Sequence, residues 1–174
     1  SDVYKRQVCK YVEVDGKVME LTPQLREQLR QVNLRLNKQG MRVLTVAVKR
    51  DAHADAVYSV ADEQDMIMIG FMGFLDPAKE TAKTAIASLH GHGINVKVLT
   101  GDNAIVAQKV CRDVGIDADE YLLGTDIDHL SDEELAAKAA KTNLFAKLNP
   151  MQKSRIIETI QAAGHTVGFM GDGI

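Results

Sequence analysis

The sequence predicts an α/β protein in which a parallel sheet is covered by helices on both faces. From about residue 73 onward, short apolar runs that end on small polar turns alternate with amphipathic segments. This alternation is typical of parallel strands, because each pair needs a crossover connection that is usually a helix. Residues 8–72 follow a different order, with a hairpin, a helix and two strands. We therefore expect a smaller α+β unit over residues 8–72, followed by a doubly wound α/β unit over residues 73–174.

The first unit is expected to begin with a β-hairpin and a helix. Apolar runs at residues 8–14 and 18–21 flank Asp15-Gly16, and an Asp-Gly pair between two such runs is a strong hairpin signal. Thr22 and Pro23 then provide an N-cap and a first helical residue. A helix should therefore follow the hairpin directly and end at Gly40.

Two strands are expected after this helix. Residues 42–50 alternate, and Leu44, Val46 and Val48 would form the apolar face. Residues 66–75 are apolar enough for a central strand, broken at its two glycines. A domain boundary near Gly73 follows from this pattern.

In the second unit, glycine, proline and capping residues divide the chain into helices and strands. We expect helices at 76–91, 104–114, 131–141 and 150–163, and strands at 95–100, 121–123, 144–146 and 167–170. The chain stops directly after the last of these strands, on a glycine-flanked aspartate, and a natural domain rarely stops there. The sequence therefore predicts a domain truncated at its C-terminal end.

Composition excludes several classes of protein. The 174 residues carry 21 Lys and Arg against 24 Asp and Glu, a net charge of −3, with no basic block or interleaved aromatics that would bind nucleic acid. Cys9 and Cys111 lack metal-binding or disulfide spacing and are expected to be reduced thiols of a cytosolic protein. No apolar stretch approaches the length of about 20 residues that crosses a bilayer, so we expect this part of the protein to be soluble.

The candidate chemistry lies at Thr100-Gly101-Asp102, a turn between a predicted strand and a predicted helix. Ligands bind beyond the carboxyl ends of parallel strands, where loops converge and helix N-termini face outward. Lys153 lies near the start of a predicted helix, and Asp172 follows another predicted strand. Both are therefore expected at the same edge of the sheet. A hydroxyl, an ammonium group and a carboxylate for Mg²⁺ are what phosphoryl transfer needs. Each residue alone is also compatible with an ordinary turn or a solvated helix face.

Four motifs in this order resemble the cytoplasmic portion of P-type cation-transporting ATPases, most closely the bacterial magnesium-importing type. A single such motif would be weak, whereas four in order are specific. The motifs are Asp76-Pro77-Ala78-Lys79-Glu80, Thr100-Gly101-Asp102-Asn103, Phe145-Ala146-Lys147-Leu148-Asn149-Pro150-Met151-Gln152-Lys153 and Gly171-Asp172-Gly173-Ile174. The similarity covers residues 8–174, and residues 1–7 fit nothing recognisable and are expected to be an appended end.

The resemblance implies a haloacid-dehalogenase-like phosphorylation domain over residues 73–174, preceded by the C-terminal part of a nucleotide-binding domain over residues 8–72. The family uses ATP as substrate and Mg²⁺ as cofactor and forms an aspartyl-phosphate. The implied catalytic residues are Thr100, Asp102 and Lys153; the implied nucleotide-binding residues are Arg42, Thr100, Gly101, Asp102, Lys147 and Lys153; and the implied metal ligand is Asp172. The partner would be the rest of the pump, with its transmembrane domain, in a bacterial inner membrane.

The chain departs from the family pattern in three ways. The phosphorylated Asp of the DKTGT segment, the KGA nucleotide segment and the residues that normally follow Asp172 are absent. Position 147 is Lys where many members have Arg, which keeps the charge but loses a bidentate donor. No residue that would contact the transported ion is present, so magnesium rests on overall similarity. Without its nucleophile, the chain alone is expected to be inactive.

Two other functions remain open from the sequence. A free-standing phosphatase of the haloacid-dehalogenase superfamily would need a nucleophilic Asp after an early strand, and no Asp-x-Asp of that kind is present. A non-catalytic nucleotide-binding module would need only part of the motifs. Hydrophobic spans in the flanking coding sequence would favour the pump over both.

Overall fold

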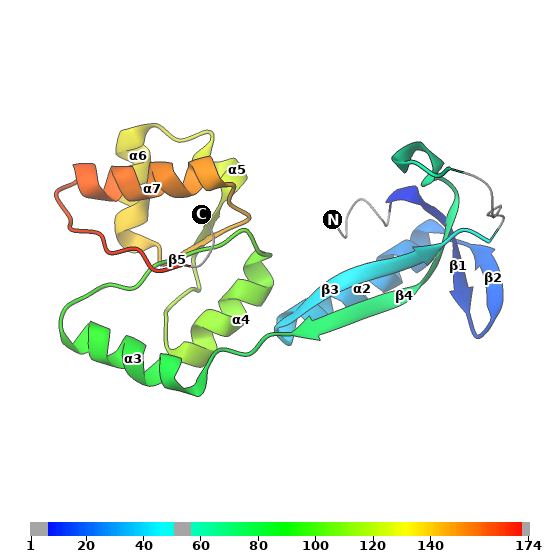
Figure 1. Cartoon of the computed structure of the whole chain (residues 1–174), viewed down its shortest axis with the longest axis horizontal. Coiled ribbons are helices and arrows are strands. Elements are labelled where there is room, and N and C mark those ends of the chain that lie inside the picture. Colours follow the sequence, from blue (N-terminus) through cyan, green and yellow to red (C-terminus); the bar gives the residue numbers. More distant parts are fainter. Residues whose placement is uncertain (1–6, 51–56, 172–174) are drawn as a thin grey trace. The chain divides into compact units, whose positions relative to one another are not determined.

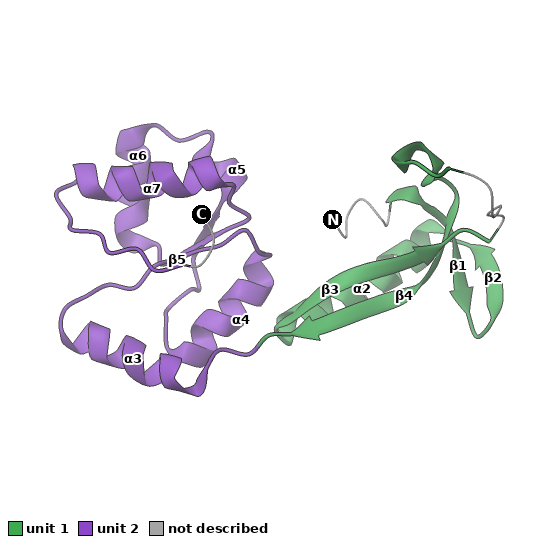
Figure 2. Cartoon of the chain, viewed as in Figure 1, with its two compact units in different colours: residues 1–76 green, residues 77–174 purple. Residues whose placement is uncertain are grey.

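The chain forms two compact units, which a computed structural model describes over residues 7–50 and 57–171. The first unit comprises residues 1–76 and the second residues 77–174 (Figure 2). Gly73, where the sequence suggests the boundary, lies inside a strand, three residues before the division. Both units combine helices with a sheet, so the prediction of a mixed α/β protein is confirmed.

The first unit is a four-stranded sheet with one long helix (Figure 1). The sheet has the order β2-β1-β4-β3, and only the β1 and β4 pair is parallel. Thr22 caps the helix by accepting a hydrogen bond from the Leu25 N–H (3.3 Å), as the sequence predicts. The elements are β1 (Cys9–Val14), β2 (Lys17–Glu20), α2 (Pro23–Lys38), β3 (Met41–Val48), the 3₁₀ turn η1 (Val60–Asp62) and β4 (Met66–Leu75).

The buried face of β3 is the opposite of the expected one. Val43 and Thr45 are buried, whereas Leu44 is 46% exposed. Helix α2 lies along β3, and its Leu25 and Leu29 pack against the same cluster of buried residues that Ala47 contacts. Burial of a strand face depends on which side the helix covers, and alternation alone does not contain that information.

Strand β4 is also not broken at its glycines. It runs without interruption from Met66 to Leu75 in the centre of the sheet. Its pairing with β3 is irregular only between Val46 and Ala47, opposite Gly70. A bulge absorbs this irregularity and leaves the strand intact.

The second unit has a three-stranded parallel sheet of order β5-β7-β6. Strands and helices alternate along the chain, as the sequence predicts for this part. The elements are α3 (Glu80–Gly91), β5 (Val98–Leu99), α4 (Ala104–Val114), β6 (Tyr121–Leu123), α5 (Gly124–Ile127), α6 (Asp132–Lys141), β7 (Leu144–Ala146) and α7 (Pro150–Ala162).

The central strand β7 contributes to two separate apolar clusters. Phe145 belongs to a cluster with Leu135 of α6 and Ile156 of α7. The adjacent Leu144 belongs to the other, with Cys111 of α4 and a partly buried residue of α3, Ile86. Neighbouring residues of a strand point to opposite faces, so helices cover both faces of this short sheet.

Three sequence predictions for the second unit are wrong. Helix α3 begins at Glu80 and not at Asp76-Pro77. Helix α5 lies in a segment for which the sequence predicts no helix. Residues 167–170 form no strand, and Met170 is 96% exposed. A strand needs a hydrogen-bonding neighbour, and no strand among the described residues pairs with this segment.

Both cysteines are buried and free. Burial raises the pKa of the Cys111 thiol to about 11. Within residues 7–50 and 57–171, no helix has the length and apolar character needed to cross a bilayer.

Candidate functional site

The Thr100-Gly101-Asp102 turn lies where the sequence places it, between β5 and α4. The Asp102 N–H donates a hydrogen bond to the Thr100 hydroxyl oxygen (3.1 Å), which closes the turn. Asn103 then caps α4 by accepting from the Ile105 N–H (2.9 Å). Thr100 and Asp102 are half-buried and Gly101 is exposed. The turn therefore places the Thr100 hydroxyl and the Asp102 carboxylate beside the N-terminus of α4. A helix N-terminus attracts anions.

A second loop, between β7 and α7, is joined to this turn by backbone hydrogen bonds. The Thr100 N–H donates to the Phe145 carbonyl (2.9 Å), and the Leu148 N–H donates to the Thr100 carbonyl (3.0 Å). The Lys147 N–H donates to the Asp102 carbonyl (3.0 Å). The two motifs are 45 residues apart in sequence, and the parallel pairing of β5 with β7 brings them together.

Two lysines, Lys147 and Lys153, lie in this second loop and in the first turn of the helix after it. Lys147 is exposed, and its backbone has a φ of 54°, in the left-handed region that non-glycine residues rarely adopt. Lys153 is half-buried in the first turn of α7. Both lysines thus lie in the segment that follows β7. The start of this segment is hydrogen-bonded to the Thr100 turn.

The remaining predicted site residues lie elsewhere. Arg42 is an exposed residue of β3 in the first unit, opposite Phe74 of β4. Asp172 lies outside the described residues. In the described part of the chain, no three His, Cys, Asp or Glu side chains gather closely enough to hold a metal ion.

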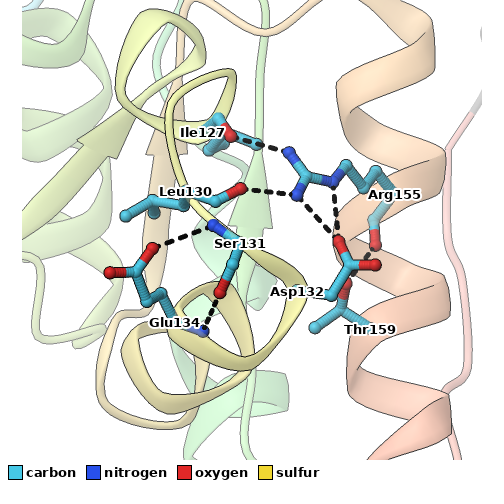
Figure 3. A network of polar contacts seen from close by, with 7 residues as sticks. All are labelled: Ile127, Leu130, Ser131, Asp132, Glu134, Arg155 and Thr159. Carbon is cyan, nitrogen blue, oxygen red and sulfur yellow. Dashed lines mark hydrogen bonds and ion pairs between the residues drawn. The ribbon is translucent and has the colours of Figure 1, made fainter.

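Several residues that support the loop are missing from the sequence prediction. Gln152 and Asn149 form a reciprocal capping box at the start of α7, a signal that the Asn-x-x-Gln spacing contains. Gly124 and Arg155 have no such signal, because their partners are distant in sequence. Arg155 donates hydrogen bonds to the Ile127 and Leu130 carbonyls, both at 2.7 Å (Figure 3).

Comparison with known proteins identifies the relatives of this chain. A family model described as P-type ATPase, cytoplasmic domain N, matches residues 6–81. The chain is 47% identical, over 167 residues and 96% of its length, to the magnesium-transporting ATPase, P-type 1, of Escherichia coli K12. The chain belongs to the P-type ATPase family. This confirms the family that the four motifs predict.

The relative that is named as a calcium-transporting ATPase is less similar to this chain than those named as magnesium-transporting ATPases. The calcium-transporting ATPase 1 of Lactococcus lactis is 32% identical over 168 residues, 95% of the chain. The Salmonella typhimurium LT2 magnesium-transporting ATPase, P-type 1, is 47% identical over 167 residues, 96% of this chain. The chain spans about a fifth of the length of these relatives, 19% of the Lactococcus protein and 18% of the Salmonella one.

Proposed function

We propose that this chain is a cytoplasmic part of an ATP-driven cation pump of the magnesium-transporting type, on the cytoplasmic side of a bacterial inner membrane. The pump would couple ATP hydrolysis, through an aspartyl-phosphate, to ion movement. Magnesium is favoured as the transported ion, because identity is 47% to magnesium-transporting relatives and 32% to a calcium-transporting one. The remainder of the pump polypeptide, with its transmembrane domain, would be the partner of this chain.

The observation that carries the proposal is the joining of the Thr100 turn to the Lys147 loop. Three backbone hydrogen bonds hold these segments together at the carboxyl ends of β5 and β7. A phosphoryl group needs donors and positive charge around its oxygens, held in place before the reaction. Thr100 would donate its hydroxyl to the phosphoryl group, and Lys153 would neutralise it. Gly101, Asp102 and Lys147 would contact the nucleotide.

Arg42 is proposed to bind the phosphates of ATP from the nucleotide-binding domain, residues 8–72. Its exposure on β3 leaves it accessible to a ligand. A planar guanidinium matches phosphate geometry better than an ammonium group does.

A haloacid-dehalogenase-like sheet is proposed for residues 73–174. Among the described residues, β5 pairs only with β7, so its other edge is open. A parallel strand from the rest of the polypeptide, placed at this edge, would carry the phosphorylated aspartate.

Mg²⁺ is proposed as the cofactor, with Asp172 as one ligand. The described residues alone do not form a carboxylate set for the ion, so no step is assigned to it. When bound, Mg²⁺ offsets phosphate charge. The chain's own contribution at this edge is to hold Thr100, Lys147 and Lys153 in place.

The test uses the full-length pump and measures phosphoenzyme formed from radiolabelled ATP. Lys153→Ala should slow its formation by orders of magnitude, since it removes a charge that stabilises the transferring phosphoryl group. Lys138→Ala is the matched control, because Lys138 is an exposed lysine in the last turn of α6. Equal labelling of the two variants would reduce Lys153 to a solvated surface residue and contradict the proposal.

A further inference from the structure

The left-handed backbone of Lys147 requires support from its surroundings. A residue with a side chain in this conformation costs about 1 kcal/mol or more, and such residues cluster at functional sites. The next residues, Leu148 and Asn149, lead directly into α7. A change in the Lys147 backbone would therefore alter the direction in which the chain enters this helix.

Gly124, at the start of α5, packs directly against this loop. A Cβ at Gly124 would lie 2.7 Å from the Lys147 carbonyl oxygen and 2.5 Å from Oε1 of Gln152. Both distances are shorter than real Cβ contacts. The φ of Gly124 is not positive, so glycine is needed here for close approach and not for backbone freedom.

Gln152 joins Gly124 to the first turn of α7. Its Nε2 donates to the Gly124 carbonyl (3.0 Å) and to Oδ1 of Asp128 (2.8 Å). Its Oε1 accepts from the Asn149 N–H (2.9 Å). Gln152 is 7% exposed; its hydrogen bond to Gly124 is buried, and its bonds to Asp128 and Asn149 are part-buried.

Arg155 fixes the same segment one helical turn later. Its guanidinium donates to the carbonyls of Ile127 and Leu130 and to Oδ1 of Asp132, which all lie in or next to the loop between α5 and α6 (Figure 3). The segment 124–132 is therefore hydrogen-bonded to α7 at two positions, through Gln152 and through Arg155.

We propose that Gly124 and Gln152 are positioning residues for the phosphate site. They hold the Lys147 backbone in its left-handed conformation and fix the first turn of α7. In this way they set where Lys147 and Lys153 stand relative to the Thr100 turn. The proposal rests on the proposed function, because it concerns the same phosphate site.

The test measures binding of inorganic phosphate to the 174-residue chain, by the amide NMR shifts of Thr100 and Asp102. Gly124→Ala should weaken phosphate affinity at least fivefold, since the new methyl group displaces the Lys147 carbonyl. Gly91→Ala is the matched control, because an added Cβ there meets nothing within 4 Å. It should leave the affinity unchanged.

Gln152→Ala gives the same test without a steric clash. It removes the hydrogen bonds to Gly124 and Asn149 and should also weaken phosphate binding at least fivefold, with the amide shifts of α4 retained as evidence of folding. This variant carries the test if Gly124→Ala does not fold. A purely structural role would lower the melting temperature without changing phosphate affinity in the folded protein.

Two results would overturn the proposal, and they are distinguishable. If Lys153→Ala weakens phosphate binding but Gln152→Ala and any folded Gly124→Ala keep it within twofold, the positioning role is wrong and the site assignment stands. If phosphate shifts neither Thr100 nor Asp102 in the unaltered chain, the phosphate site itself is wrong, and the positioning role fails with it.

Discussion

The Lys147 N–H donates a hydrogen bond to the carbonyl oxygen of Asp102, across 3.0 Å. This bond joins two motifs that the sequence separates by a helix, a strand and two further helices. It also links the backbone of a candidate cation to that of the candidate carboxylate. The backbone positions from which the two side chains extend are therefore fixed relative to each other.

Arg155→Ala is expected to destabilise the second unit by about 1–3 kcal/mol. The change leaves the part-buried Leu130 carbonyl without its Arg155 donor, and it leaves the Ile127 carbonyl with only the Leu130 N–H at 3.3 Å. Urea unfolding followed by amide signals of the second unit measures the effect. Arg112→Ala is the control, because Arg112 forms only an exposed ion pair with Asp119 at 3.2 Å and should change stability by less than about 0.5 kcal/mol. Equal effects of the two changes would contradict the assigned role of Arg155.

Stability should fall at alkaline pH because of Cys111. Burial raises its pKa in the folded state from 9.0 to about 11, so the unfolded chain loses its thiol proton first. The stabilisation is fully present below pH 9 and is lost as the pH rises toward 11, by about 2.7 kcal/mol in all. Unfolding free energies at several pH values, compared between the unaltered chain and Cys111→Ala, isolate this contribution. Parallel pH profiles for the two proteins would contradict it.

The isolated chain should not become phosphorylated. Positioning of a phosphate accelerates transfer only when a nucleophile is present, and the DKTGT aspartate lies outside this sequence. Incubation with radiolabelled ATP and Mg²⁺, followed by acid quench and hydroxylamine, measures any acyl-phosphate. A hydroxylamine-sensitive label would mean that another carboxylate, such as Asp76 or Asp102, acts as nucleophile.

Asp172→Asn in the full-length pump should remove most Mg²⁺-dependent phosphoenzyme. The change replaces a charged oxygen ligand with a neutral amide, which binds a hard cation more weakly. Phosphoenzyme formation across a range of Mg²⁺ concentrations is the measurement. Unchanged labelling at ordinary Mg²⁺ concentrations would exclude Asp172 as a ligand.

Local signals predicted elements accurately where the deciding residues are neighbours in sequence. Helix α4 runs from Ala104 to Val114 as predicted, because Asn103 caps it and Gly115 ends it with a φ of 84°. The helix predicted at 131–141, which Ser131 caps, and the Asp15-Gly16 hairpin are confirmed for the same reason. In each case a side chain or turn satisfies backbone groups a few residues away.

Predictions failed where the deciding partner is distant. Residues 167–170 have the composition of a strand, but no strand in the described part of the chain pairs with them. Val43 and not Leu44 is buried in β3, because α2 covers that face. Both outcomes depend on elements that are remote in sequence, which local patterns do not encode.

The sequence by itself determined the family, the order of most of the elements and the candidate residues Arg42, Thr100, Gly101, Asp102, Lys147, Lys153 and Asp172. It could do so because motifs, caps and turns are short-range patterns. Only the tertiary structure decided that the Thr100 turn and the Lys147 loop are bonded together, and that Gly124 and Gln152 support them. The physical reason is that the parallel pairing of β5 and β7, and the packing of α5 against α7, join segments between 28 and 48 residues apart.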